Sequence, residues 1–196
     1  MILITGIAHT GSSILVSLFD ELGFSTGKEI FPDRHIEILR DERIQEMINK
    51  GQVPKWPRVI KHLGGFCYNL DYHVNRWNWK VKHVIVLVRD LETSVNRRLV
   101  KKTVNGKTFG ISNKEWISYS EEQKKKLCRE HLKDELGSLF FNLVPKDYSF
   151  FCMHYPRWVE DSNYAYRKLN TILNIEYDKF MKVYTKIIDP SKVGTY

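Results

Sequence analysis

The sequence predicts one α/β domain, in which helices cover both faces of a central parallel sheet of about four or five strands. Residues 2–5 form an apolar run that is followed by a glycine-bounded turn and an amphipathic segment over 12–23. Residues 83–88 are an unbroken, mostly β-branched run, which is typical of a parallel strand buried on both faces. Shorter apolar runs at 58–61 and 148–153 alternate with helical patterns. We expect the first strand to lie inside the sheet.

Helical spacing of apolar side chains supports the first helix, and Gly23 marks its expected end. A weak helical stripe covers 33–50, and Pro54 and Pro57 mark a linker. Residues 103–114 are expected to be loop. The other expected helices are 66–79, a helix from an Asp90 cap to about Val100, 115–143 with a break near Gly137, 161–174 and 177–186.

The composition limits which kinds of protein and partner are possible. The chain has 196 residues, of which 42% are hydrophobic, so it can bury a core as a single domain over 1–196. In that domain 103–143 would be a loop and helical insert near the site. The net charge of +8 indicates either an anionic partner or simply a basic surface. The basic residues are scattered and match no zinc-finger or homeodomain pattern, so nucleic acid is not the favoured partner.

Cysteines and apolar runs indicate the compartment. The three cysteines are widely spaced, which favours free thiols in a reducing compartment over a disulfide framework. No apolar run reaches membrane-spanning length. Because the first strand is expected to start at residue 2, we expect no signal peptide. We therefore expect a soluble, cytoplasmic protein.

The turn after the first strand has the features of a phosphate-binding loop. Gly6 and Gly11 bracket four residues, and glycines allow positive φ angles and close backbone approach. The helix that follows offers unbonded N–H groups and a partial positive charge. The hydroxyls of Thr10, Ser12 and Ser13 are further candidate ligands. Ser12 stands where an ATP-binding loop has lysine, which argues against ordinary ATP hydrolysis. The alternative is a tight turn that binds no ligand.

A second motif begins where the most apolar strand ends. Arg89 occupies that end, the edge at which open α/β sheets bind ligands, and its planar guanidinium suits phosphate. Ser94, Asn96, Arg97 and Arg98 follow on the next helix as further candidates. The alternative for Arg89 is an ion pair with Asp90 or a nearby acid, and the alternative for Arg97 and Arg98 is a solvated helix face.

A third motif ends the strand at 58–61. Lys61 and His62 stand at its carboxyl end and so at the same edge of the sheet. A histidine can take a proton from a hydroxyl near neutral pH, and a lysine can offset charge on a transferred group. The alternative for His62 is an ordinary surface or core histidine.

Together these three motifs resemble those of the sulfotransferase family, a branch of the P-loop proteins. The family's loop reads roughly Lys/Arg-Ser-Gly-Thr-Thr/Ser, and here residues 9–13 read His-Thr-Gly-Ser-Ser. The family's strand ending in arginine is similar to 86–90, and its Arg-Ile-Ile-Lys-Thr-His-Leu strand is similar to 58–63, which is one residue shorter. The resemblance covers about residues 1–100, and 155–161 looks like the tail of compact prokaryotic or viral members.

The resemblance implies a P-loop NTPase-like three-layer sandwich and a sulfotransferase. Such an enzyme transfers a sulfuryl group from 3′-phosphoadenosine 5′-phosphosulfate to a hydroxyl or amine of a small-molecule or carbohydrate acceptor, without metal. It implies His62, Lys61 and His9 as catalytic residues. The cofactor would be held by Gly6, His9, Thr10, Gly11, Ser12, Ser13, Arg89, Ser94, Asn96 and Arg97.

Two departures from the family pattern keep other functions open. His9 replaces the basic residue of the loop, and Arg97 occupies the place of the serine that binds the 3′-phosphate, so Ser94 or Asn96 would have to substitute. One alternative is a small-molecule kinase of the same fold, for which Ser12 or Ser13 and Asp90 are the candidate magnesium ligands. The other is a non-catalytic nucleotide-binding domain. Walls of an acceptor pocket are expected in 24–56 and 103–130, with candidate lining residues Trp56, Phe66, Tyr68, Trp116 and Tyr119.

Overall fold

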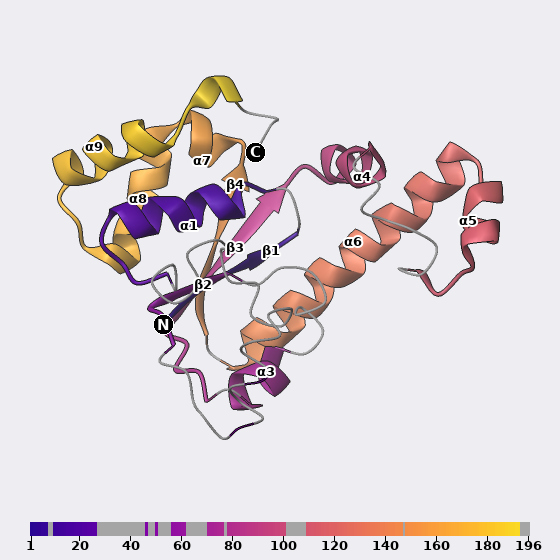
Figure 1. Ribbon diagram of the computed structural model, residues 1–196, viewed down its shortest axis with the longest axis horizontal. Coiled ribbons are helices and arrows are strands. Elements are labelled where there is room, and N and C mark those ends of the chain that lie inside the picture. The colour runs from indigo at the N-terminus through magenta and orange to yellow at the C-terminus, as the bar shows by residue number, and fades with distance from the viewer. Residues whose placement is uncertain are drawn as a thin grey trace.

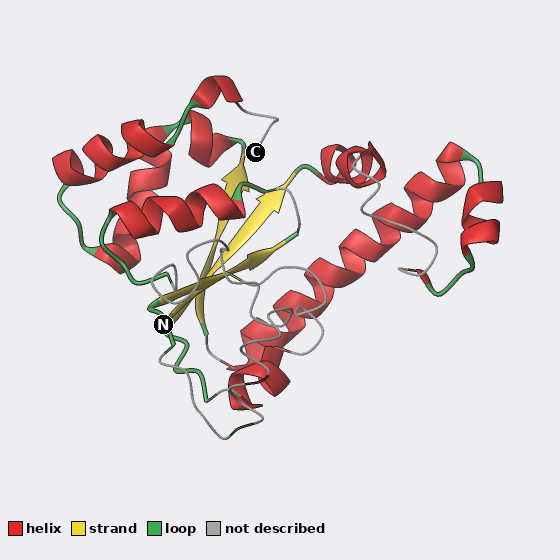
Figure 2. Ribbon diagram, in the orientation of Figure 1, coloured by secondary structure: helices red, strands yellow, loops and turns green. Residues whose placement is uncertain are grey.

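The protein is an α/β domain built on a parallel sheet (Figures 1 and 2). The computed structural model describes residues 1–7, 10–26, 46, 50, 56–61, 70–76, 78–100, 109–146 and 148–192. Within these residues the strands are β1 (Ile2–Gly6), β2 (Val59–Lys61), β3 (His83–Arg89) and β4 (Ser149–Tyr155). Their order is β2-β1-β3-β4 and every pair is parallel. The predicted fold class is therefore confirmed, and β1 lies inside the sheet as expected.

The last position of β1 requires glycine, because the backbone of β3 leaves no room for a side chain there. The φ of Gly6 is +129°, and a Cβ atom at this position would stand 2.1 Å from the carbonyl oxygen of Leu87. Gly6 is also the register partner of Leu87. Any side chain at this position would therefore push the two central strands apart.

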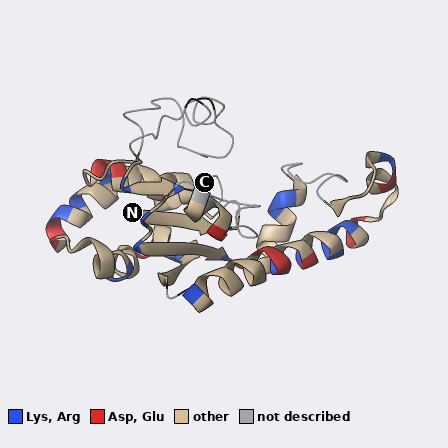
Figure 3. Ribbon diagram, turned by 90° about the horizontal axis from the view of Figure 1, so that it is seen from below, with Lys and Arg blue, Asp and Glu red and all other residues tan. Residues whose placement is uncertain are grey.

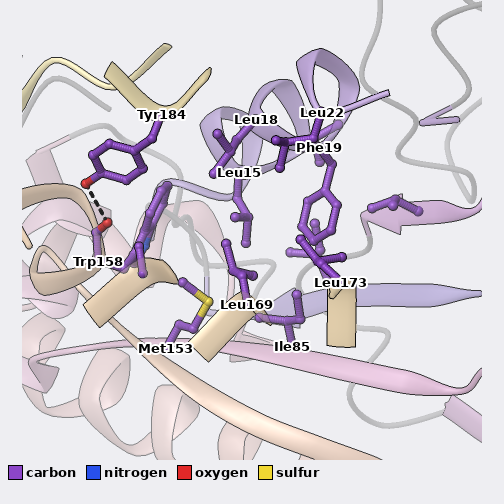
Figure 4. Close-up of a cluster of buried hydrophobic side chains, with 14 of the residues drawn as sticks. Leu15, Leu18, Phe19, Leu22, Ile85, Met153, Trp158, Leu169, Leu173 and Tyr184 are labelled. Carbon is purple, nitrogen blue, oxygen red and sulfur yellow. Dashed lines mark hydrogen bonds between the residues drawn. The ribbon is translucent and has the colours of Figure 1, made fainter. Parts of the chain in front are cut away.

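One face of the sheet is covered by α1 (Ser12–Glu21), α8 (Ser162–Leu173) and α9 (Tyr177–Ile187), which lie together in Figure 1. Alternate strand residues point into this layer, because side chains on a strand alternate between faces. Figure 4 shows part of the resulting core, in which aliphatic and aromatic side chains of the helices meet the sheet. Its buried members include Ile4, Ile85, Met153, Leu15, Phe19, Leu169 and Phe180.

The opposite face is covered by α3 (Leu70–Arg76) and the second half of α6 (Glu121–Leu143). The core on this side includes Leu3, Val84, Val86, Leu70, Leu139 and Leu143. Helix α4 (Leu91–Val100) packs against α6 through a smaller apolar cluster that includes Val95 and Leu132. Charged side chains of both signs lie along residues 121–135 of α6 (Figure 3), as its sequence predicts for a long, partly exposed helix.

The helical break expected near Gly137 is wrong, because α6 runs through that residue. The break lies at Tyr119 and Ser120, between α6 and α5 (Asn113–Ser118), so α5 begins inside the segment expected to be loop. Ser120 forms a capping box with Gln123, in which the Gln123 amide donates to Ser120 Oγ over 3.2 Å and the Ser120 amide donates to Gln123 Oε1 over 2.8 Å.

Other differences from the expected elements are small. Helix α7 (Arg157–Glu160) and the 3₁₀ turns η4 (Val144–Lys146) and η5 (Pro190–Lys192) were not predicted. Apart from residues 46 and 50, the stripe expected over 33–50 lies outside the described residues, as do 66–69 and residue 77 of the helix expected over 66–79.

Candidate functional site

The candidate residues gather at the carboxyl edge of the sheet, on the face that α1 covers. Val59 of β2 and Leu87 of β3 pack in the core beneath α1. Lys61 and Arg89 stand two residues further along the same strands, so they share that face. Since β1 lies between β2 and β3, Lys61 and Arg89 flank the chain that leaves β1 and enters α1.

We call the chain from 6 to 13 the anion loop; Ala8 and His9 within it lie outside the described residues. Gly11 caps α1 in a left-handed conformation with φ 75°, and the Leu15 amide donates to its carbonyl over 3.0 Å. Neither a capping side-chain hydrogen bond nor an acidic residue occurs in the first turn of α1. The first amides of a helix have no carbonyl of their own helix to bond, so this end favours an anion.

Lys61 brings a positive charge to this helix end. Its Nζ donates to Ser13 Oγ over 3.0 Å, across 48 residues of sequence. Lys61 is only 8% exposed, which is uncommon for a lysine. The two residues come from separate predicted motifs, and the structure brings them together.

Arg89 brings a second positive charge on the other side of β1. Its guanidinium lies over the ring of Tyr155, with 4.6 Å between Cζ and the ring centroid. Burial lowers the pKa of Arg89, and the charge of Arg97 lowers it further, while Tyr155 and Asp90 act in the opposite direction. Two guanidinium groups that repel each other in a partly buried place are suited to an anion, which would offset both.

The start of α4 confirms Asp90 as its cap. The Asp90 carboxylate accepts hydrogen bonds from the Thr93 amide over 2.8 Å and from the Thr93 hydroxyl over 2.7 Å. The hydrogen bonds from Thr93 hold the pKa of Asp90 below its ordinary value. The alternative of Asp90 as a magnesium ligand would compete with this capping role.

The structure separates the remaining candidates. Thr10 is fully buried, and its hydroxyl donates to the Ile7 carbonyl over 2.9 Å, so it braces the loop from inside. Ser94 is also buried, with its hydroxyl donating to the Asp90 carbonyl over 2.9 Å. On α4, Asn96 is exposed and Arg97 is half-buried. The other loop serine, Ser12, is buried. The predicted catalytic residues His9 and His62 lie outside the described residues.

Sequence reasoning missed the aromatic support of the loop. A Cβ atom on Gly11 would lie 2.7 Å from Trp158 Cζ2 and 3.2 Å from the Tyr155 ring. Trp158 Nε1 donates to the Thr10 carbonyl over 3.4 Å, across 148 residues of sequence. The sequence signal was an aromatic segment directly after the fourth strand, but nothing local indicates what it supports.

Sequence reasoning also missed a buried ionic cluster behind α4. Arg98 Nη2 donates to Glu135 Oε2 of α6, and both side chains are buried. His131 Nε2 lies 3.3 Å from the other oxygen of Glu135. The solvated face expected as the alternative for Arg98 is therefore wrong, because this side chain is buried and ties α4 to α6.

The described candidates for an acceptor pocket lie elsewhere or pack locally. Trp56 precedes β2, at the opposite edge of the sheet, and meets Trp79 edge-on with 5.5 Å between ring centroids. Trp116 stacks on Phe109 at 5.2 Å, and the Tyr119 hydroxyl donates to Glu115 over 2.8 Å. Phe66 and Tyr68 lie outside the described residues.

Three further observations hold for the part of the chain that the structure describes. Cys128 and Cys152 carry free thiols, as predicted, while Cys67 lies outside that part. Among the described residues, the histidine, cysteine, aspartate and glutamate side chains form no group of three or more that could hold a metal ion. None of the described helices is both long enough and apolar enough to cross a membrane.

The chain is similar to two solved structures of sulfotransferases. A sulfotransferase domain from the curacin biosynthetic pathway matches 94% of this chain and 77% of its own, with a TM-score of 0.54 and 13% identity. A sulfotransferase from Alicyclobacillus acidocaldarius matches 97% of this chain and 84% of its own, with a TM-score of 0.47 and 13% identity. No protein-family profile matches the sequence. No curated protein matches it either. The chain therefore has a fold like that of the curacin sulfotransferase domain.

Proposed function

We propose that this protein is a sulfotransferase, which transfers a sulfuryl group from 3′-phosphoadenosine 5′-phosphosulfate to a hydroxyl or amine of a small-molecule or carbohydrate acceptor. The observation that carries the proposal is the contact between Lys61 and Ser13 at the start of α1. This contact places the ammonium group of a buried lysine beside a helix N-terminus that has no acidic side chain in its first turn. The likeness in fold to a sulfotransferase domain supports the same proposal.

The chemistry of these donors fits that of the proposed sulfuryl donor. The nucleotide carries negative charge at its 5′-phosphosulfate and at its 3′-phosphate, and it supplies the activated sulfuryl group when bound. The α1 amides, Lys61 and Ser13 offer hydrogen-bond donors for one anionic group. Arg89 and Arg97 offer a second positive region for the other. The loop side of β1 would therefore bind the 5′ end, and the α4 side would bind the 3′-phosphate.

Each residue has a task that its chemistry allows. Ser13 accepts a hydrogen bond from Lys61, so its own hydroxyl proton remains available for an anion. Lys61 offsets negative charge on the transferred group, in a buried place where charge interactions are strong. From the sequence resemblance, His9 would contact the same group and His62 would take the proton of the acceptor.

Ligand binding without metal tests the proposal. Adenosine 3′,5′-bisphosphate should bind in the presence of a chelator, and at 100 times its Kd it should raise the unfolding free energy by about 2.7 kcal/mol. Arg89→Ala should weaken this binding by about 1.5–3 kcal/mol, the value of a charged hydrogen bond, and should weaken adenosine 5′-monophosphate binding far less. Arg157→Ala is the matched control, because Arg157 also lies over a tyrosine ring, that of Tyr164, at 4.4 Å.

Each outcome separates the alternatives. Equal losses for the two nucleotides would show that Arg89 does not recognise the 3′-phosphate. Tighter binding of Mg·ATP than of the bisphosphate would favour the kinase. Tight bisphosphate binding without donor turnover, across phenol, amine and sugar acceptors, would favour a non-catalytic domain.

A further inference from the structure

We propose that Tyr184 of α9 is a positioning residue for the anion loop, acting through Trp158 of α7. This inference rests on the proposed function, because it takes the loop to be the place where the anionic group binds. Tyr184 holds two carbonyls of α7, and the Trp158 side chain supports the loop at Thr10 and Gly11. An element near the end of the described chain would thus set the shape of a loop near its beginning.

The first link is the contact between Trp158 and the loop. The indole is fully buried, and its Nε1 donates to the Thr10 carbonyl over 3.4 Å. The adjacent residue, Gly11, leaves only 2.7 Å between a Cβ atom and Trp158 Cζ2. Gly11 stands directly before the first turn of α1, whose amides would bind the anionic group in the proposed function. A shift of the indole therefore displaces the amides that would bind the ligand.

The second link is the contact between Tyr184 and α7. Helix α7 is a single turn of four residues, and the chain becomes extended at Asp161. The last carbonyls of such a helix have no amide of their own helix to bond. The Tyr184 hydroxyl lies 2.9 Å from the Trp158 carbonyl (Figure 4) and 2.7 Å from the Val159 carbonyl. It donates its one proton to this pair.

Geometry makes this hydroxyl a strong constraint on the indole. Tyr184 is only 4% exposed and belongs to the core between the sheet and the helices α1, α8 and α9. One of the two carbonyls that it holds belongs to Trp158 itself, so the hydroxyl contacts the backbone of the residue whose indole contacts the loop. One buried hydrogen bond thereby determines how the indole meets the loop.

Tyr184→Phe tests the inference, because it removes one oxygen and keeps the ring. We expect the Kd for adenosine 3′,5′-bisphosphate to rise about three- to tenfold, the range to which the net contribution of one hydrogen bond corresponds. We also expect the Trp158 indole N–H resonance of the ligand-free protein to shift, after assignment with Trp158→Phe. Tyr166→Phe is the matched control, because its hydroxyl donates to the Ile175 carbonyl over 3.1 Å and Tyr166 packs against the same core. That variant should lose stability but keep the Kd and the resonance of the parent.

The inference is overturned if Tyr184→Phe leaves both the Kd and the indole resonance unchanged, or if Tyr166→Phe changes both equally. If the parent protein binds no bisphosphate, the proposed function fails, and the ligand-free resonance alone decides whether Tyr184 positions Trp158. If Tyr184→Phe does not fold, Trp158→Phe takes its place, with Trp79→Phe on the other face of the sheet as its control. Equal affinities in those two variants would also overturn the inference.

Discussion

The anion loop and helix α4 stand on either side of the same candidate site, but they are held by different physical means. Beneath the loop the support is aromatic, since Trp158 and Tyr155 pack against Gly11. Behind α4 a buried ion pair between Arg98 and Glu135 adds to the apolar packing against α6. Both supports are buried, and both come from elements distant in sequence.

The two supports should tolerate different amino-acid substitutions. A packed aromatic surface fails when volume is added, because buried rings cannot move aside without strain. A buried ion pair fails when one charge is removed, because the other charge is then left without compensation in a medium of low dielectric. We therefore expect the loop side of the site to be sensitive to added side-chain volume. We expect the α4 side to be sensitive to the loss of one charge.

The largest effect is expected from Glu135→Gln. Removing one partner of a buried ion pair should lower the unfolding free energy by about 3–5 kcal/mol, as measured by denaturant unfolding. Glu92→Gln is the matched control, because Glu92 pairs with Arg129 across the same two helices at the surface, at 2.5 and 2.9 Å. That variant should change stability little.

A double variant sharpens the test. Arg98→Met combined with Glu135→Leu replaces both charges by apolar side chains and should recover most of the lost stability. Similar losses for Glu135→Gln and Glu92→Gln would contradict the view that buried charge holds α4.

A smaller loss is expected from Gly11→Ala on the aromatic side. The left-handed conformation and the 2.7 Å approach to Trp158 both oppose a Cβ atom, so we expect a loss of roughly 2–4 kcal/mol. Gly23→Ala is the control, because Gly23 also has a positive φ, 87°, but its Cβ would meet no atom within 4 Å. It should lose only about 1–2 kcal/mol. Equal losses would mean that backbone strain alone, and not the aromatic surface, requires glycine at position 11.

The smallest expected effect is on the pH dependence of stability. Burial alone would raise the pKa of Glu135, but the hydrogen bond from His131 and the charge of Arg98 outweigh it, so the pKa lies below its ordinary value of 4.5. A carboxylate with a lowered pKa stabilises the fold above its unfolded pKa, and this contribution is lost as the pH falls through the folded value. Stability of the parent should thus fall below about pH 4.5. Acid titrations of unfolding free energy should show a shallower fall in the Arg98→Met/Glu135→Leu variant, and parallel curves would refute the assignment.

Local pattern was sufficient to predict the strands and most helices. The apolar run at 83–88 forms β3, as expected of a strand that is buried on both faces. Asp90 caps α4 by bonding the turn that directly follows it, so this contact is also local in sequence. The break between α5 and α6 was missed although it is also local, because the capping box at Ser120 was overlooked in favour of Gly137.

The α/β class, the order of the strands along the chain, and the position of Lys61 and Arg89 at the carboxyl edge can all be predicted from the sequence, since they follow from periodicity and strand ends. The contacts of Lys61 with Ser13, of Trp158 with Thr10 and of Arg98 with Glu135 appear only in the folded chain. The partners in these pairs stand 48, 148 and 37 residues apart. Local propensity carries no information about such pairs, because they form only when packing of the whole core brings distant segments within contact distance.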